Sequence, residues 1–114
     1  MDNEFRVEKQ GDIGIIKCAR QVETEACTIL GNRIKDMMKE NIYKIIIDFS
    51  LTNYVSSMGW GTILGSMNAA KKGGGNIVVA SMNPQVKTIY ESVEFDELIK
   101  SYDTVIDAIK AFLK

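Results

Sequence analysis

The sequence contains no histidine among its 114 residues, and this absence excludes several kinds of chemistry at once. A Ser-His-Asp or Cys-His nucleophile, a histidine metal ligand and a phosphohistidine relay all require an imidazole. The carboxylates, lysines and tyrosines that remain form no recognisable catalytic constellation. We therefore expect a protein that is not an enzyme and that uses neither a metal site nor a cofactor.

The chain also lacks a strong excess of charge, a paired cysteine motif and a secretory signal. A net charge of −1 gives no electrostatic reason to expect a nucleic-acid partner. Cys18 and Cys27 do not form a CxxC pair, so we expect two buried and reduced thiols. The first residues, Met1 to Glu4, are acidic and lack the apolar segment of a signal peptide. We expect one cytoplasmic domain over residues 1–114, with no membrane insertion.

Charged side chains are also missing from Phe49 to Ala70, in the stretch around which the chain is organised. Residues 44–49 form a β-branched run typical of a strand buried on both faces. A polar loop follows over residues 50–56, and Ser57 is predicted to be the N-cap of a helix. The stretch is too polar to span a bilayer. Its uncharged helix start, with adjacent serines, suits contact with a protein partner.

The predicted helix has one apolar face and several glycines. The apolar face consists of Trp60, Ile63, Leu64 and Met67. Gly73 is predicted to end the helix in the left-handed conformation. Gly59, Gly61 and Gly65 follow a GxGxxxG spacing, which is neither a Walker nor a Rossmann phosphate loop. Glycine inside a helix costs about 1 kcal/mol relative to alanine, so we expect these three to allow close packing on the sheet or another helix. A ligand or partner surface is the alternative.

The remaining segments alternate between strand and helix patterns. We expect a hairpin over residues 5–18, a helix capped by Thr24, a strand over 76–81, a helix starting at Asn83-Pro84, an edge strand within 99–102 and a last helix capped by Thr104. The inward apolar positions are predicted as Ala26, Leu30, Ile34, Met37 and Met38; Val86, Ile89, Tyr90 and Val93; and Val105, Ile106, Ile109, Phe112 and Leu113. This order predicts an α/β protein with a mixed sheet whose parallel part is covered by helices.

Asp48, at the end of the central strand, could be a structural residue or a phosphoryl acceptor. An aspartyl-phosphate receiver domain needs an acidic pair after its first strand and a lysine at the end of a later strand. Cys18-Ala19 and Ala80-Ser81 supply neither group. We interpret Asp48 as a structural acceptor for loop amides, with the receiver as an alternative.

The adjacent serines, Ser56 and Ser57, need no explanation beyond helix capping. A phosphate at this position would nevertheless face unpaired N–H groups and the positive end of the helix dipole. Such a site tolerates an added charge of about −2.

Several motifs together resemble the STAS family, the sulfate transporter and anti-sigma factor antagonist domain. Residues 45–50 resemble its central strand, and residues 54–61 resemble its motif Asp-Ser-Ser/Ala-Gly-Leu-Gly. The later landmarks are Lys71-Lys72-Gly73-Gly74, Val78-Val79 and Pro84-Gln85-Val86-Lys87. The chain departs from the family at Ser56, where an aspartate is usual, at Met58, where a small residue is usual, and near Val22, where an acidic residue is missing.

The resemblance implies a sheet of four or five strands with flanking helices. It also implies a non-enzymatic switch that regulates transcription. An anti-sigma factor serine kinase of the GHKL type binds the unmodified domain, phosphorylation of a serine releases it, and a PP2C-type phosphatase reverses the step. The phosphoacceptor falls on Ser57, with Ser56 less favoured. The implied partner-binding residues are Ser56, Ser57, Met58, Gly59, Gly61 and Val22. Within the same fold, a STAS subunit of an ABC-type lipid transporter is the alternative.

Overall fold

The computed structural model of the protein describes residues 5–114, so the expectation about Met1 to Glu4 lies outside it. The strands are β1 (Arg6–Gln10), β2 (Ile13–Lys17), β3 (Gln21–Val22), β4 (Lys44–Asp48), β5 (Tyr54–Val55), β6 (Asn76–Ala80) and β7 (Ser101–Tyr102). The helices are α1 (Glu25–Lys39), α2 (Ser57–Lys72), α3 (Pro84–Ser92) and α4 (Val105–Phe112), with a 3₁₀ turn η2 (Phe95–Glu97).

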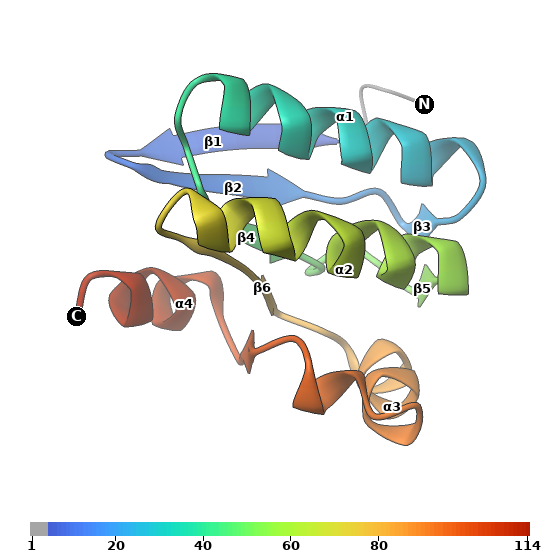
Figure 1. Ribbon diagram of the computed structural model, residues 1–114. Coiled ribbons are helices and arrows are strands. Elements are labelled where there is room, and N and C mark those ends of the chain that lie inside the picture. Colours follow the sequence, from blue (N-terminus) through green and yellow to red (C-terminus); the bar gives the residue numbers. More distant parts are fainter. Residues whose placement is uncertain (1–4) are drawn as a thin grey trace.

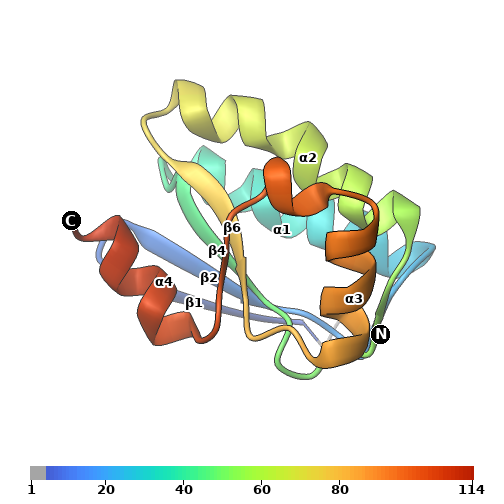
Figure 2. The same ribbon diagram turned by 90° about the horizontal axis from the view of Figure 1, so that it is seen from below.

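The main sheet has five strands in the order β1-β2-β4-β6-β7. β1 is antiparallel to β2, and the other neighbours are parallel. The two crossovers from β2 to β4 and from β4 to β6 have the same hand, which places α1 and α2 on one face of the sheet. α4 lies on the other face (Figures 1 and 2). The mixed α/β sheet, its N-terminal hairpin and its short edge strand are as the sequence predicts.

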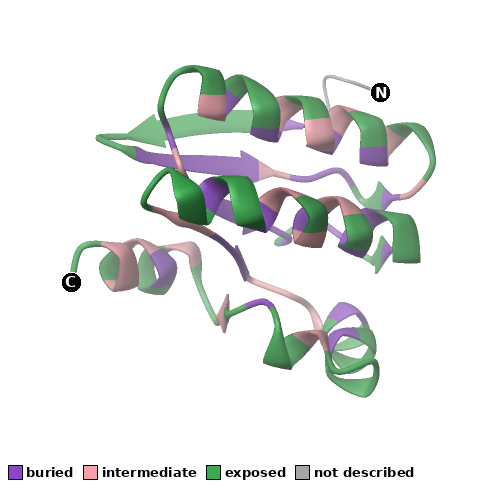
Figure 3. Ribbon diagram, in the orientation of Figure 1, coloured by how far each residue is buried: buried purple, intermediate pink, exposed green. Residues whose placement is uncertain are grey.

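Two apolar cores follow from the alternation of side chains along the buried strands. In β4, Ile45 and Ile47 face the large core under α1 and α2, whereas Ile46 faces the small core under α4. Figure 3 shows the contrast between the buried strand β2 and the exposed edge strand β1. The central strands are therefore covered on both faces, as expected for a parallel sheet.

The predicted inward faces of α3 and α4 are wrong at four positions. Ile89 and Val93 are 46% and 51% exposed, and Ile106 and Leu113 are 64% and 71% exposed. α4 turns the buried Ala108 toward the sheet, and helical spacing puts Ile106 and Leu113 on the opposite side of the helix. In α1, Cys27 is buried, whereas the expected Ala26 and Met38 are only partly buried.

Two helix ends also differ from expectation. Thr24 precedes α1, but its side chain makes no capping hydrogen bond and its φ is 44°. Gly73 has an ordinary φ of −84°, and the left-handed residue after α2 is Gly74, with a φ of 92°. Asn83 and Thr104 cap α3 and α4 as predicted. Within residues 5–114, no helix has both the length and the apolar character needed to cross a bilayer.

Candidate partner-binding site

The candidate site is the start of α2, where Ser56, Ser57 and Met58 follow one another; we call these three residues the serine surface. Ser56 is the N-cap, with φ −73° and ψ 167°, and its hydroxyl accepts a hydrogen bond of 3.1 Å from the Gly59 amide. Its own amide donates to the Val22 carbonyl at 2.9 Å. The prediction that Ser57 is the cap is therefore wrong by one residue. Ser56 is held extended by its bond to β3, and the helix begins directly after it.

The loop before the serine surface is held from two sides. Thr52 is fully buried and its hydroxyl donates to the Ala19 carbonyl at 2.8 Å. The side-chain nitrogen of Asn83 donates to the Thr52 carbonyl at 3.0 Å, while its oxygen accepts from the Val86 amide. Asn83 thus caps α3 and also holds the loop in place. The Asn83-Pro84 pattern predicts only the capping role. These hydrogen bonds therefore hold in place the loop that leads into the serine surface.

The glycines of α2 have two different roles. A Cβ atom on Gly59 would lie 2.8 Å from Val55 Cγ1 and 3.0 Å from the Val22 carbonyl oxygen, so close packing is required there. Gly61 and Gly65 would meet nothing within 4 Å, and the expectation of close packing is wrong for them. Both line an open groove of about 360 Å³ between α1 and α2, which also borders Met58.

Exposure divides the six expected partner-binding residues. Ser57, Met58 and Gly61 are exposed, with 60% of Met58 accessible, and Ser56 is partly buried. Val22 and Gly59 are buried, because Val22 faces inward from β3 and Gly59 packs against it. Neither residue is accessible at the surface of the free protein, so their part in partner binding remains a prediction.

Trp60 anchors the start of α2 in the core. The indole is 1% exposed, and its ring centroid lies 5.6 Å from Phe49, 5.7 Å from Tyr90 and 5.2 Å from Phe95. Cys27, on α1, supports the cap from the other side, with its sulfur 3.6 Å from the Ser56 hydroxyl oxygen. Sequence reasoning placed Cys27 in the interior but gave no signal for this contact. The rigid setting leaves Ser57 and Met58 as the outward groups.

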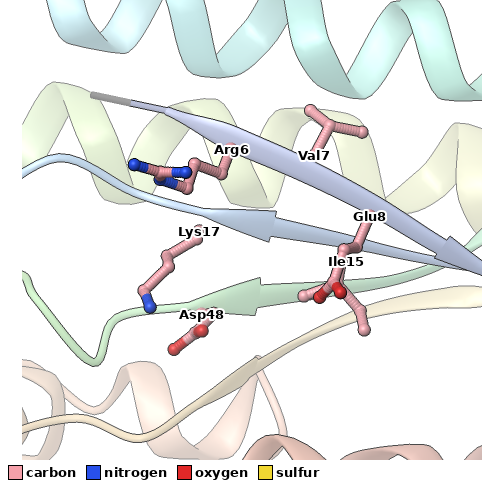
Figure 4. Close-up of a pocket in the computed structure, with 6 residues that line it drawn as sticks. All are labelled: Arg6, Val7, Glu8, Ile15, Lys17 and Asp48. Atoms are coloured by element: carbon pink, nitrogen blue, oxygen red, sulfur yellow. The ribbon is translucent and has the colours of Figure 1, made fainter. Parts of the chain in front are cut away.

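Asp48 is separate from the serine surface. It is 8% exposed, and its Oδ1 accepts a hydrogen bond of 2.9 Å from the Ser50 amide. Lys17, its neighbour in register on β2, extends toward it (Figure 4). Sequence reasoning missed this basic neighbour because it sought a lysine only at the ends of later strands. Burial, together with the Asp48 charge, raises the pKa of the Cys18 thiol far above its usual range.

Comparison with known proteins agrees with this geometry. A putative anti-sigma factor antagonist from Thermotoga maritima superposes with a TM-score of 0.84 at 20% identity, covering 99% of this chain and 97% of that one. The anti-sigma factor antagonist SpoIIAA in its unphosphorylated form gives 0.80 at 18% identity, with 94% of each chain covered. The phosphorylated form of the Bacillus SpoIIAA gives 0.71 at 17% identity, covering 94% and 97%. The family model of the STAS domain matches residues 4–108, and the chain therefore belongs to the STAS domain family.

Proposed function

We propose that the protein is a partner-switching regulator, an anti-sigma factor antagonist controlled by phosphorylation of Ser57. Its partner is an anti-sigma factor that is also a serine kinase of the GHKL type, and a PP2C-type phosphatase restores the unmodified form. The observation that carries this proposal is the exposed Ser57 beside the exposed Met58, at a helix start with no acidic residue in its first turn. A protein partner can bury such a surface without leaving a charged side chain unpaired in the interface.

The two serines are suited to different tasks. The Ser56 hydroxyl accepts from the Gly59 amide and lies 3.6 Å from the Cys27 sulfur, so a phosphate there would have to displace both of these contacts. Ser57 is the first helical residue and is exposed. A kinase can reach it without disturbing the fold. We therefore assign the phosphate to Ser57 and keep Ser56 as the capping residue.

A phosphate on Ser57 would be tolerated in the free protein and penalised in the complex. The first N–H groups of a helix lack partners within the helix, and the dipole there favours negative charge. In an uncharged interface, a group carrying about −2 charge cannot lose its water without a matching cation. A hundredfold loss of affinity requires only about 2.7 kcal/mol. The switch therefore needs no change of fold.

The known structures of SpoIIAA support this proposal, since that antagonist is described in unphosphorylated and phosphorylated forms. The comparison contributes the fold, and the family resemblance implies Ser57 as the phosphoacceptor. The exposure of Ser57 and the hydrogen bond of Ser56 support that choice. In this role the protein binds and releases partners and catalyses no reaction itself.

Incubation with the cognate kinase and ATP, followed by peptide mass spectrometry, tests the assignment. We expect one phosphate on Ser57, none on the Ser57→Ala variant, and unchanged phosphorylation at Ser57 in Ser56→Ala. Phosphorylation of Ser57→Ala to the wild-type level would contradict the assignment. Copurification with the ATPase of a lipid transporter, together with no phosphorylation by any kinase, would favour the transporter-subunit alternative.

A further inference from the structure

The face of the sheet away from α1 and α2 is incompletely covered. α4 packs against β4, β6 and β7 on this face (Figure 2). The region beside β1 and the end of β2 opens into a hollow (Figure 4). The hollow has a volume of about 560 Å³ and is lined by Arg6, Val7, Glu8, Ile15, Lys17 and Asp48. Sites for small molecules typically have volumes of about 300–1,000 Å³. The hollow is therefore large enough for a compact ligand.

Strand register arranges three charged residues in a row across this face. Arg6 is paired with Lys17, and Lys17 is paired with Asp48. Register partners point to the same face, and neighbouring strands lie about 4.8 Å apart. The row therefore runs cation, cation, anion. Asp48 is held in place, because it is almost buried and its Oδ1 accepts the Ser50 amide.

The pairing of Arg6 with Lys17 places two like charges opposite each other, and Asp48 can balance only one of them. Like charges placed directly opposite each other destabilise an antiparallel pair. Glu8, the acid on the same strand, is paired with Ile15 instead of Lys17. An unfavourable local pairing of this kind is typical of a functional site. An anion between the two cations would remove their repulsion.

We propose that this hollow binds a small zwitterion, a compound that carries a phosphate or carboxylate group and an ammonium group. The anionic group lies between Arg6 and Lys17, where the guanidinium offers paired donors. The ammonium group lies at Asp48, and Ile15 forms an apolar floor between them. The carboxyl ends of parallel strands, here β2 and β4, are a common place for ligands. Because the hollow lies on the face opposite α1 and α2, this proposal does not rest on the proposed function.

Titration of isotope-labelled protein with O-phosphoethanolamine, followed by amide NMR, tests the site. We expect saturable shifts at residues 6–8, 15–17 and 48–50, with binding at least tenfold tighter than that of inorganic phosphate or ethanolamine alone. Arg6→Gln and Lys17→Gln should each weaken binding at least tenfold. Lys87→Gln, a variant of an exposed lysine on α3, is the matched control and should bind like the wild type.

Asp48→Asn tests the ammonium half of the ligand separately from its anionic half. Asparagine removes the negative charge but keeps an oxygen acceptor for the Ser50 amide. It should weaken phosphoethanolamine binding at least tenfold without weakening inorganic phosphate. The proposal would be overturned by the lack of a saturable shift or by equal binding of phosphate and phosphoethanolamine. Unaltered binding by Arg6→Gln, Lys17→Gln and Asp48→Asn would also overturn it. Lipid headgroups share this chemistry, so sedimentation with phosphatidylethanolamine vesicles identifies the source. Binding of the free compound without cosedimentation supports a soluble ligand, and cosedimentation supports a headgroup in the same site.

Discussion

The hydroxyl oxygen of Ser56 lies 3.1 Å from the amide nitrogen of Gly59, and this hydrogen bond closes the first turn of α2. It separates the roles of two adjacent serines that look equivalent in the sequence. Ser56 belongs to the fold, while Ser57 stays exposed at the first helical position. The difference can be measured through stability and through binding.

We expect Ser56→Ala to lower the free energy of unfolding by about 1 kcal/mol, the usual effect of losing an N-cap side chain. Ser57→Ala should change it by less than about 0.5 kcal/mol, as expected for an exposed position away from such contacts. Urea unfolding, followed by the fluorescence of Trp60, measures both variants under the same conditions. A larger loss for Ser57→Ala than for Ser56→Ala would contradict the capping assignment.

The glycines of α2 give a second matched pair. Gly59→Ala should destabilise the protein by about 1–3 kcal/mol, because the new methyl group would overlap Val55 and the Val22 carbonyl. Gly65→Ala should instead stabilise it by about 0.5–1 kcal/mol, since the site is open and alanine favours the helix. Thermal and urea unfolding of the two variants provide the comparison. Equal effects of the same sign would show that the helix packing is different.

Stability should fall at alkaline pH because of Cys18. The thiol is fully buried, and burial raises its folded-state pKa, whereas the thiol of the unfolded chain titrates near 8.5. The stabilising contribution is complete below about pH 8.5 and is lost as pH rises above it, because the unfolded state then holds fewer protons. The slope approaches about 1.4 kcal/mol per pH unit.

Urea unfolding between about pH 8 and pH 10 measures this slope, and Cys18→Ala is the control. The variant should be less stable at neutral pH, because it leaves a cavity, but its stability should depend less on pH. Burial also raises the pKa of Tyr90, which adds a further loss at higher pH in both proteins. An identical slope in the two proteins would assign the alkaline loss to groups other than Cys18.

Much of the fold could be predicted from sequence because the signals were local. The run of isoleucines in β4, the Asn83-Pro84 start of α3 and the Thr104 cap each have a direct physical cause. Apolar faces were harder to predict. Ile106 and Leu113 fit an amphipathic pattern, but Ala108 determines which side of α4 faces the sheet. Helical spacing alone does not show how much of a helix is covered.

The candidate site was predicted in outline but not in detail. The adjacent serines identified the start of α2 but not which of them is the cap. That is decided by the hydrogen bond from the Ser56 amide to the Val22 carbonyl, which joins residues far apart in the sequence. The burial of Val22 depends on the same pairing of β3 with β5. The register pairing of Lys17 with Asp48 on two parallel strands could likewise not be predicted before the strand order was known.

In the proposed switch, a partner covers Ser57 and Met58 and is released by negative charge at Ser57. Titration calorimetry of the purified partner against wild type, Ser57→Asp and Met58→Ala tests it most directly, with Ile106→Ala on α4 as an exposed apolar control. We expect Ser57→Asp and Met58→Ala to weaken binding at least tenfold, or about 1.4 kcal/mol, while circular dichroism and melting temperature stay near wild type. Ile106→Ala should bind normally. Unchanged affinity for both site variants, with a loss for the α4 control, would place the binding surface elsewhere on the domain and contradict the proposed switch.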